Sequence, residues 1–234
     1  MIVWLASYPR SGNTFARMLL YHGFGFPTYS IYTDRYMEDM AEHGILDGSP
    51  LPASREELAA AEETYFIKTH ELPEDDNPAV YIVRDGREAL LSYAHYIRRF
   101  TNYKHPRHFI GRLLGRFKFE RLLDGLVREE SGTKRDWSAH VLEWYARQAP
   151  TATILFDDLV TSPVEALSGA LAEMNVAPQA EHGGIPSFEQ LKERWPKFFR
   201  KGKGRDWRDE MSEEVEQLFW EHHKEGMKRA GFER

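Results

Sequence analysis

Short apolar and β-branched runs recur along the chain, and most are followed by a stretch in which apolar residues return at helical spacing. Four runs have the length and composition of strands buried on both faces: Ile2 to Ala6, Tyr65 to Thr69, Ala79 to Arg84 and Thr153 to Phe156. Alternation of such strands with helices is typical of α/β proteins with parallel sheets. We therefore expect an α/β fold with a central parallel sheet flanked by helices.

Helix start signals lie between these expected strands. Three pairs have capping-box spacing: Ser54 with Glu57, Ser162 with Glu165, and Ser187 with Gln190. Pro163 stands at a first helical position, where proline is favoured. A long C-terminal helix is expected to begin near Ser212 and to end near Gly231. Around 100–137 the strand signal lapses, and we expect a helical or irregular insertion there.

Length and composition limit the domain count and the compartment. A chain of 234 residues can bury one substantial core but is short for two enzyme-sized domains, so we expect a single domain over 1–234. No apolar run approaches the roughly 20 residues of a membrane-spanning helix, and no basic leader precedes the first apolar stretch. The chain has no cysteine, which suits a reducing compartment. We expect a cytoplasmic protein with no membrane contact.

The charge balance argues against a nucleic-acid partner. The formal net charge is -6, although a local basic pocket remains compatible with an acidic chain. Residues 192–208 are strongly basic, and a solvated face or a nucleic-acid patch is the alternative interpretation of that segment. The acidic flanks of this segment and the net charge of the chain argue against nucleic acid.

The loop after the first expected strand has the features of an anion site. Residues 7–15 (SYPRSGNTF) lead from the strand into a helical pattern, and a helix N-terminus offers unpaired N–H groups with partial positive charge. Gly12 allows close approach of the backbone. A fixed charge and three side-chain donors surround it: Arg10, Ser11, Asn13 and Thr14. The P-loop pattern G-x-x-x-x-G-K-[ST] is absent, and a plain turn with Asn13 as helix cap is the alternative.

This loop resembles the 5'-phosphosulfate-binding loop of the sulfotransferases that use 3'-phosphoadenosine 5'-phosphosulfate (PAPS), usually written Y-P-[KR]-S-G-[TN]-T-W. Three further segments match that family in order: residues 68–70 (KTH), residues 83–87 (VRDGR) with Ser92, and residues 200–202 (RKG). By this resemblance, the chain is identified as a member of the PAPS-dependent sulfotransferase family, of the soluble cytosolic type. The resemblance implies a single P-loop-like domain.

The resemblance also implies which residues bind the donor. Those matching the phosphosulfate loop, the 3'-phosphate contacts and the adenine contacts are Arg10, Ser11, Gly12, Asn13, Thr14, Phe15, Arg84, Ser92, Phe156, Arg200, Lys201 and Gly202. Two simpler interpretations stay open. Arg84 can pair with Asp85, and Phe156 can be a core residue that ends a strand.

This chain differs from the family's usual residue at five positions. The substitutions are Arg10 for lysine, Phe15 for tryptophan, Gly86 for proline, Phe156 for tyrosine, and Arg205 where glycine is expected. A guanidinium presents a flat donor fork where an ammonium is a point charge, so the placement of charge on the departing oxygen differs. The smaller ring of Phe15 favours weaker nucleotide binding.

The candidate catalytic residues come from the strand that ends in KTH. The carboxyl ends of parallel strands face the crevice in which such sheets hold ligands. By resemblance, His70 is the general base toward the acceptor, a task that suits an imidazole. Lys68, on the same strand face, and Arg10 would stabilise charge on the departing phosphate oxygen. An ordinary surface or core histidine and a solvated lysine are the alternatives.

The expected reaction is transfer of a sulfuryl group from PAPS to a hydroxyl or amine of a small-molecule or glycan acceptor, with release of 3',5'-ADP and without metal. A P-loop-type nucleotide kinase, which requires ATP and magnesium, is one alternative. A non-catalytic protein that binds PAPS or its product is another. Candidate acceptor-pocket residues, which are equally compatible with a core, are Tyr93, His95, Tyr96, Tyr103 and His105. Neither the acceptor nor the oligomeric state follows from the sequence.

Overall fold

The computed structural model describes residues 1–32, 41, 43–46, 51–100, 115–129, 136–179, 184, 187–194 and 207–232. Its contacts divide the chain into two compact units that are interleaved in sequence. The first unit contains Met1–Ser7, Ser11–Arg84 and Arg147–Lys203, and the second contains Tyr8–Arg10, Asp85–Ala146 and Gly204–Arg234. The single domain expected over 1–234 stays a prediction.

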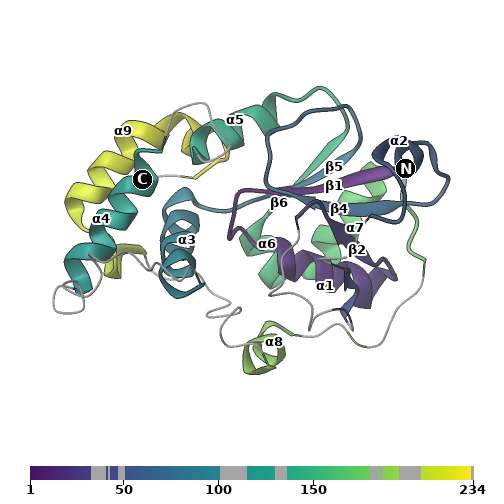
Figure 1. Cartoon of the computed structure of the whole chain (residues 1–234), viewed down its shortest axis with the longest axis horizontal. Helices are drawn as coiled ribbons and strands as arrows, with labels where there is room; N and C mark the ends of the chain where they lie inside the picture. The colour runs from purple at the N-terminus through teal and green to yellow at the C-terminus, as the bar shows by residue number, and fades with distance from the viewer. Residues whose placement is uncertain are drawn as a thin grey trace. The chain divides into compact units, whose positions relative to one another are not determined.

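The first unit is built on a parallel sheet of six strands among the described residues (Figure 1). The strands are β1 (Ile2–Ser7), β2 (Thr28–Ser30), β3 (Ile45–Leu46), β4 (Tyr65–Thr69), β5 (Ala79–Val83) and β6 (Thr151–Leu155). Their order is β3-β2-β4-β1-β5-β6, and every neighbouring pair is parallel. The predicted α/β fold with a parallel sheet is confirmed.

The four longer strands lie where the apolar runs predicted them, with small shifts at their ends. Arg84 lies one residue past β5, and Phe156 opens a helix instead of ending β6. The sequence interpretation missed β2 and β3, because strands of three and two residues are too short to show an alternating pattern.

Helices flank this sheet. Those of the first unit are α1 (Asn13–Phe24), α2 (Arg55–Ala60), α6 (Phe156–Thr161), α7 (Pro163–Glu173) and α8 (Phe188–Arg194). Helices α1 and α7 pack against each other and share one apolar core with alternate residues of β1 and β5, Val3 and Leu5 with Val80 and Ile82 (Figure 1). Side chains two residues apart in a strand share a face, so Ser7, two residues after Leu5, lies on this same face of the sheet, at the candidate site.

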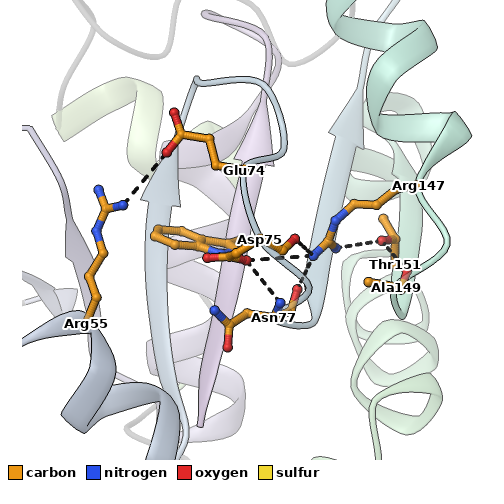
Figure 2. Close-up of polar contacts among 8 residues, drawn as sticks. Arg55, Glu74, Asp75, Asn77, Arg147, Ala149 and Thr151 are labelled. Carbon is orange, nitrogen blue, oxygen red and sulfur yellow. Dashed lines mark hydrogen bonds and ion pairs between the residues drawn. The ribbon is translucent and has the colours of Figure 1, made fainter.

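A polar clamp holds the amino ends of β5 and β6 (Figure 2). The indole N–H of Trp4 donates to both carboxylate oxygens of Asp75, at 2.9 and 3.1 Å. The Arg147 guanidinium donates to the Asp75 carbonyl at 2.7 Å, to the Asn77 carbonyl, and to Thr151 Oγ1 at 2.9 Å. These bonds fix the end of the sheet opposite to the carboxyl ends of the strands.

The second unit is helical in its described part. It contains α3 (Gly86–Phe100), α4 (Gly115–Val127), α5 (Trp137–Ala146), the short 3-10 helix η4 (Trp207–Asp209) and α9 (Glu213–Arg229). A Cβ added at Gly86 would lie 2.7 Å from Trp137 and 2.8 Å from Phe219, so the start of α3 has no room for a larger residue. The insertion expected around 100–137 is helical where it is described, in α4.

The helix signals were largely correct. Ser54 and Glu57 form the predicted capping box, and Ser187 and Gln190 exchange the same two hydrogen bonds. Ser212 caps α9, which ends just before Gly231. Ser162 precedes α7 but makes no side-chain cap bond, because it also ends α6, where its N–H donates to the Asp158 carbonyl at 2.8 Å.

Candidate functional site

The loop between β1 and α1 presents a helix N-terminus behind a left-handed glycine. Gly12 has φ 104° and ψ 3° and immediately precedes Asn13, the first residue of α1. The Asn13 side chain donates to the Leu5 carbonyl at 2.8 Å and to Ser7 Oγ at 3.3 Å. The alternative in which Asn13 caps the helix is therefore wrong: its amide ties the helix back to β1.

A buried hydroxyl in this loop matches the needs of an oxyanion site. Ser11 Oγ is buried and has no hydrogen-bond partner within the described ranges. A buried hydroxyl left unpaired costs roughly 1–3 kcal/mol, and an anion can accept a hydrogen bond from it. Because the first N–H groups of α1 are adjacent, the residues of the loop fit a phosphate or sulfate group.

Phe156 joins this loop to Arg84. The Arg84 guanidinium carbon lies 4.3 Å from the centroid of the Phe156 ring. A Cβ at Gly12 would lie 2.6 Å from Cδ2 of the same ring, so Gly12 is required by its φ angle and by this contact. With 5% exposure, Phe156 packs in the interior and supports a predicted phosphate ligand. Its contact with adenine stays a prediction.

Phe15 and Thr14 occupy different surroundings in α1. Phe15 is 3% exposed and belongs to the apolar core of the first unit. That burial does not support the adenine role implied by the resemblance, which stays a prediction. Thr14 is half-buried at the first turn of α1, where a hydroxyl can reach a bound anion.

His70 is oriented by the backbone of β1. Its Nδ1 lies 2.7 Å from the Ser7 carbonyl oxygen and 3.4 Å from Ser7 Oγ. A carbonyl oxygen can only accept, so Nδ1 carries the proton, and in the neutral imidazole Nε2 then carries the lone pair. The parallel register pairs Leu5 with Lys68, which brings the end of β1 beside the end of β4. This tautomer is the one that a general base needs.

Lys68 lies two residues before His70, on the same face of β4. It is 6% exposed, so the alternative of a solvated strand lysine is wrong. Its Nζ lies 5.6 Å from the centroid of the Tyr32 ring. A buried ammonium at the carboxyl end of a strand is suited to stabilise charge that develops nearby.

Tyr32 is a site residue that the sequence interpretation missed. Its hydroxyl accepts from the His70 backbone N–H at 2.9 Å and donates to Glu71 Oε1 at 2.9 Å. Its ring stacks on the His70 imidazole, with 5.7 Å between centroids and 23° between planes. Burial is the main cause that raises the pKa of this phenol. No motif or periodicity marks Tyr32, since it follows the very short strand β2.

Two predicted site residues lie in the second unit. Arg10 has φ 69°, which is uncommon for a residue other than glycine, and its guanidinium carbon lies 5.2 Å from the centroid of the Tyr96 ring. Ser92 is half-buried on α3. The predicted ligands Arg200, Lys201 and Gly202 lie outside the described residues.

Asp85 is bound by Arg87. Two of the Arg87 nitrogens reach its carboxylate, Nη2 at 2.6 Å and Nε at 3.0 Å. The same guanidinium carbon lies 4.2 Å from the Trp207 ring centroid and 5.2 Å from that of Trp220. Arg87 thus connects the start of α3 with η4 and α9, a role that the sequence motif did not indicate.

The candidate acceptor residues of α3 pack with their neighbours in the second unit. Tyr93 meets Tyr8 edge-on and stacks near Tyr96. His95 lies 2.7 Å from Glu210 through Nε2. The remaining two candidates, Tyr103 and His105, lie outside the described residues.

Two further observations concern the described part of the chain only. It contains no helix long and apolar enough to cross a bilayer. It also contains no group of three or more histidine, aspartate or glutamate side chains placed to hold a metal ion. The expected cytoplasmic location and the expected absence of a metal stay predictions.

An all-parallel sheet whose first strand passes through a glycine loop into a helix defines an α/β protein of the P-loop-like kind. The family model of the sulfotransferase domain matches residues 2–167. The chain belongs to this sulfotransferase family and is an enzyme of that class, which confirms the resemblance carried by the first loop. The kinase alternative is set aside.

Relatives and solved structures agree with this assignment. Mouse sulfotransferase 1E1 is 24% identical, over 96% of this chain and 82% of the relative, and its human counterpart is 22% identical, over 97% and 83%. The fold is similar to mouse sulfotransferase SULT7A1 complexed with PAP, with a TM-score of 0.64 and 20% identity over 97% of this chain and 83% of that one. A retinol dehydratase in complex with androsterone and inactive cofactor PAP gives a TM-score of 0.60 and 21% identity, over 97% and 80%.

Proposed function

We propose that this enzyme transfers a sulfuryl group from PAPS to a hydroxyl or amine of a small-molecule or glycan acceptor and releases 3',5'-ADP. The observation that carries the proposal is the 2.7 Å hydrogen bond from His70 Nδ1 to the Ser7 carbonyl. It leaves the lone pair on Nε2 of a half-buried histidine that shares a strand face with a buried lysine. That combination suits proton removal beside a departing anion.

The donor site is proposed around the β1–α1 loop. The left-handed Gly12, the buried Ser11 hydroxyl and the first N–H groups of α1 support binding of the phosphosulfate. Arg84, resting on Phe156, is assigned to the 3'-phosphate, because an arginine fork matches a phosphate monoester. The resemblance adds Arg10, Ser92, Arg200, Lys201 and Gly202 to this set. The two similar solved structures, each of a protein in complex with PAP, support this choice of donor.

The proposed chemistry divides among three side chains. His70 Nε2 takes the acceptor hydroxyl proton while the new sulfur–oxygen bond forms. Lys68 and Arg10 stabilise the electron pair that moves to the bridging phosphate oxygen as the old sulfur–oxygen bond breaks. PAPS supplies the sulfuryl group and a leaving group that is already ionised. General-base catalysis of this kind typically contributes about 10²–10⁴-fold to the rate.

The donor assignment is tested by calorimetric titration of the full chain with 3',5'-ADP and, separately, with 5'-ADP, in buffer without divalent metal. We expect a clear preference for 3',5'-ADP that Arg84→Ala abolishes. Arg55→Ala is the matched control, because Arg55 is an exposed arginine at the amino end of α2. Equal binding of both nucleotides, or no binding, would exclude the proposed donor.

Turnover is tested with radiolabelled PAPS and a panel of phenols, alcohols, amines and sugars, in the presence of a chelator. We expect labelled product with at least one acceptor class, and loss of transfer in His70→Ala. Nucleotide binding without transfer to any acceptor would instead favour a non-catalytic PAPS-binding protein. Loss of activity on chelation would contradict a metal-independent reaction.

A further inference from the structure

Tyr32 lies against both His70, to which the proposed function assigns proton removal, and Lys68, to which it assigns stabilisation of the departing charge. It lies two residues after the end of β2. Its ring stacks on the His70 imidazole at 5.7 Å, and the Lys68 Nζ lies 5.6 Å from the centroid of the same ring. The face of a phenol ring is electron-rich and attracts cations. One tyrosine therefore faces an ammonium and the imidazole that becomes cationic when it accepts a proton.

The Tyr32 hydroxyl acts as acceptor and as donor at the end of β4. It accepts from the His70 backbone N–H and donates to Glu71 Oε1, both at 2.9 Å. Burial raises the pKa of Tyr32, so the phenol keeps its proton near neutral pH and remains a donor to Glu71. Tyr32 thereby holds His70 at two points, the main chain and the ring face.

These contacts act together with the Ser7 carbonyl. The bond from His70 Nδ1 to that carbonyl fixes which nitrogen carries the proton, but one hydrogen bond leaves the ring able to rotate about it. Stacking on Tyr32, with planes 23° apart, removes that freedom. Positioning groups of this kind lower the cost of reaching the reactive geometry.

We propose that Tyr32 is a positioning residue for sulfuryl transfer: it holds the His70 imidazole in the plane that points Nε2 at the acceptor, and its ring stabilises the imidazolium that forms. The inference rests on the proposed function, because it names what orients the base of that reaction. Tyr32 is not assigned a proton-transfer step, since its hydroxyl is engaged by residues 70 and 71.

Two variants separate the hydroxyl from the ring. Tyr32→Phe keeps the stacked ring and removes the hydroxyl, whereas Tyr32→Leu removes both. Tyr29→Phe is the matched control, because Tyr29 is a half-buried tyrosine of β2 whose ring lies against Tyr65. All variants are compared as full chains with unchanged circular dichroism.

The first readout is the nitrogen spectrum of the histidine rings without donor or acceptor, in which His70 is identified by the signal lost in His70→Gln. We expect one tautomer, protonated at Nδ1, in the native chain, in Tyr32→Phe and in Tyr29→Phe. In Tyr32→Leu we expect an average of both tautomers. This readout does not depend on turnover.

The second readout is the division between kcat and KM. We expect Tyr32→Phe to lower kcat about fivefold, the effect of losing one hydrogen bond. Tyr32→Leu is expected to lower it on the order of 50-fold, part of the contribution of a general base. The KM for PAPS and the Kd for 3',5'-ADP should stay within about twofold, since the donor ligands are untouched.

An unchanged tautomer together with an unchanged kcat in Tyr32→Leu would overturn the inference and leave the proposed function intact. If Tyr32→Leu does not fold, Tyr32→Phe decides: native kcat and native hydrogen exchange at the His70 amide would overturn it. Failure of the proposed function has a different signature, namely full transfer by His70→Ala or no transfer by the native chain. If the native chain shows no transfer, the nitrogen spectrum of the histidine rings still decides whether Tyr32 positions His70.

Discussion

The Arg84 guanidinium lies 4.3 Å above the ring of Phe156, so the residue assigned to the 3'-phosphate rests on an aromatic face. The contact orients a long side chain that would otherwise sample many rotamers. It also gives the aromatic residue after β6 a role that requires no direct contact with the nucleotide base.

Replacing Phe156 with leucine should weaken donor binding through Arg84. A cation–π contact at a partly exposed site contributes about 0.5–1 kcal/mol, so we expect the Kd for 3',5'-ADP to rise about two- to fivefold. Calorimetry measures the change. Phe26→Leu is the control, since Phe26 is buried against Phe66 and should alter stability without altering the Kd. An equal rise in both variants would contradict a specific role for Phe156.

Gly12→Ala should damage both stability and donor binding. The φ angle of 104° is strained for alanine, and its Cβ would lie 2.6 Å from the Phe156 ring. We expect a loss of about 1–3 kcal/mol in the free energy of unfolding, measured in urea, and no detectable 3',5'-ADP binding. Gly169→Ala is the control: the position is helical and open, so this change should stabilise by up to about 1 kcal/mol. A neutral Gly12→Ala would show that the loop is not constrained there.

Removing the clamp at the amino ends of β5 and β6 should lower stability and spare activity. The Arg147 side chain is 5% exposed and donates to three acceptors, so Arg147→Gln is expected to cost about 2–3 kcal/mol in urea unfolding. Arg55→Gln removes an exposed pair with Glu74 and should cost at most about 1 kcal/mol. The clamp assignment fails if the two losses are equal, or if KM for PAPS changes in Arg147→Gln.

Alkaline unfolding should depend on Tyr32. The folded pKa of this phenol is raised above the value near 10 of an unfolded tyrosine, so its stabilising contribution is complete below about pH 10 and is lost as the pH rises further. Tyr32→Phe should therefore lose less stability than the native chain between about pH 9.5 and 11. Urea midpoints across this range measure the slope. Equal slopes of urea midpoint against pH in the native chain and in Tyr32→Phe would contradict the prediction. Tyr29 and Tyr145, whose pKa values are also raised, leave a residual slope in Tyr32→Phe.

The strands of the sheet were predictable where the sequence contains long apolar runs. Strands β1, β4, β5 and β6 are each five or six residues long. Their apolar runs alternate with segments in which apolar residues recur at helical spacing, and this pattern predicted them. β2 pairs with β4, which is distant in sequence, and β3 pairs with β2; no local pattern encodes either pairing. Ser162 shows a related limit: a capping spacing cannot reveal that the same residue closes the preceding helix.

The candidate site was predictable in its residue types but not in its contacts. The motif identified His70 and Lys68, yet the Ser7 carbonyl that orients His70 lies 63 residues away in the chain. Tyr32 reaches His70 from a segment without a recognisable pattern. Phe156 was expected to end a strand, and only the fold shows that its ring meets Gly12 and Arg84.

The partner of His70 Nδ1 is a peptide carbonyl, which no side-chain replacement at position 7 can remove. The orientation of the base is therefore encoded in the alignment of β1 with β4, where Ala6 lies opposite Thr69. Point substitutions along these two strands can accumulate without turning the imidazole. A single-residue insertion or deletion in either strand would turn the His70 side chain to the opposite face of the sheet, so the orientation of this base is more sensitive to a change in strand length than to substitutions along β1 and β4.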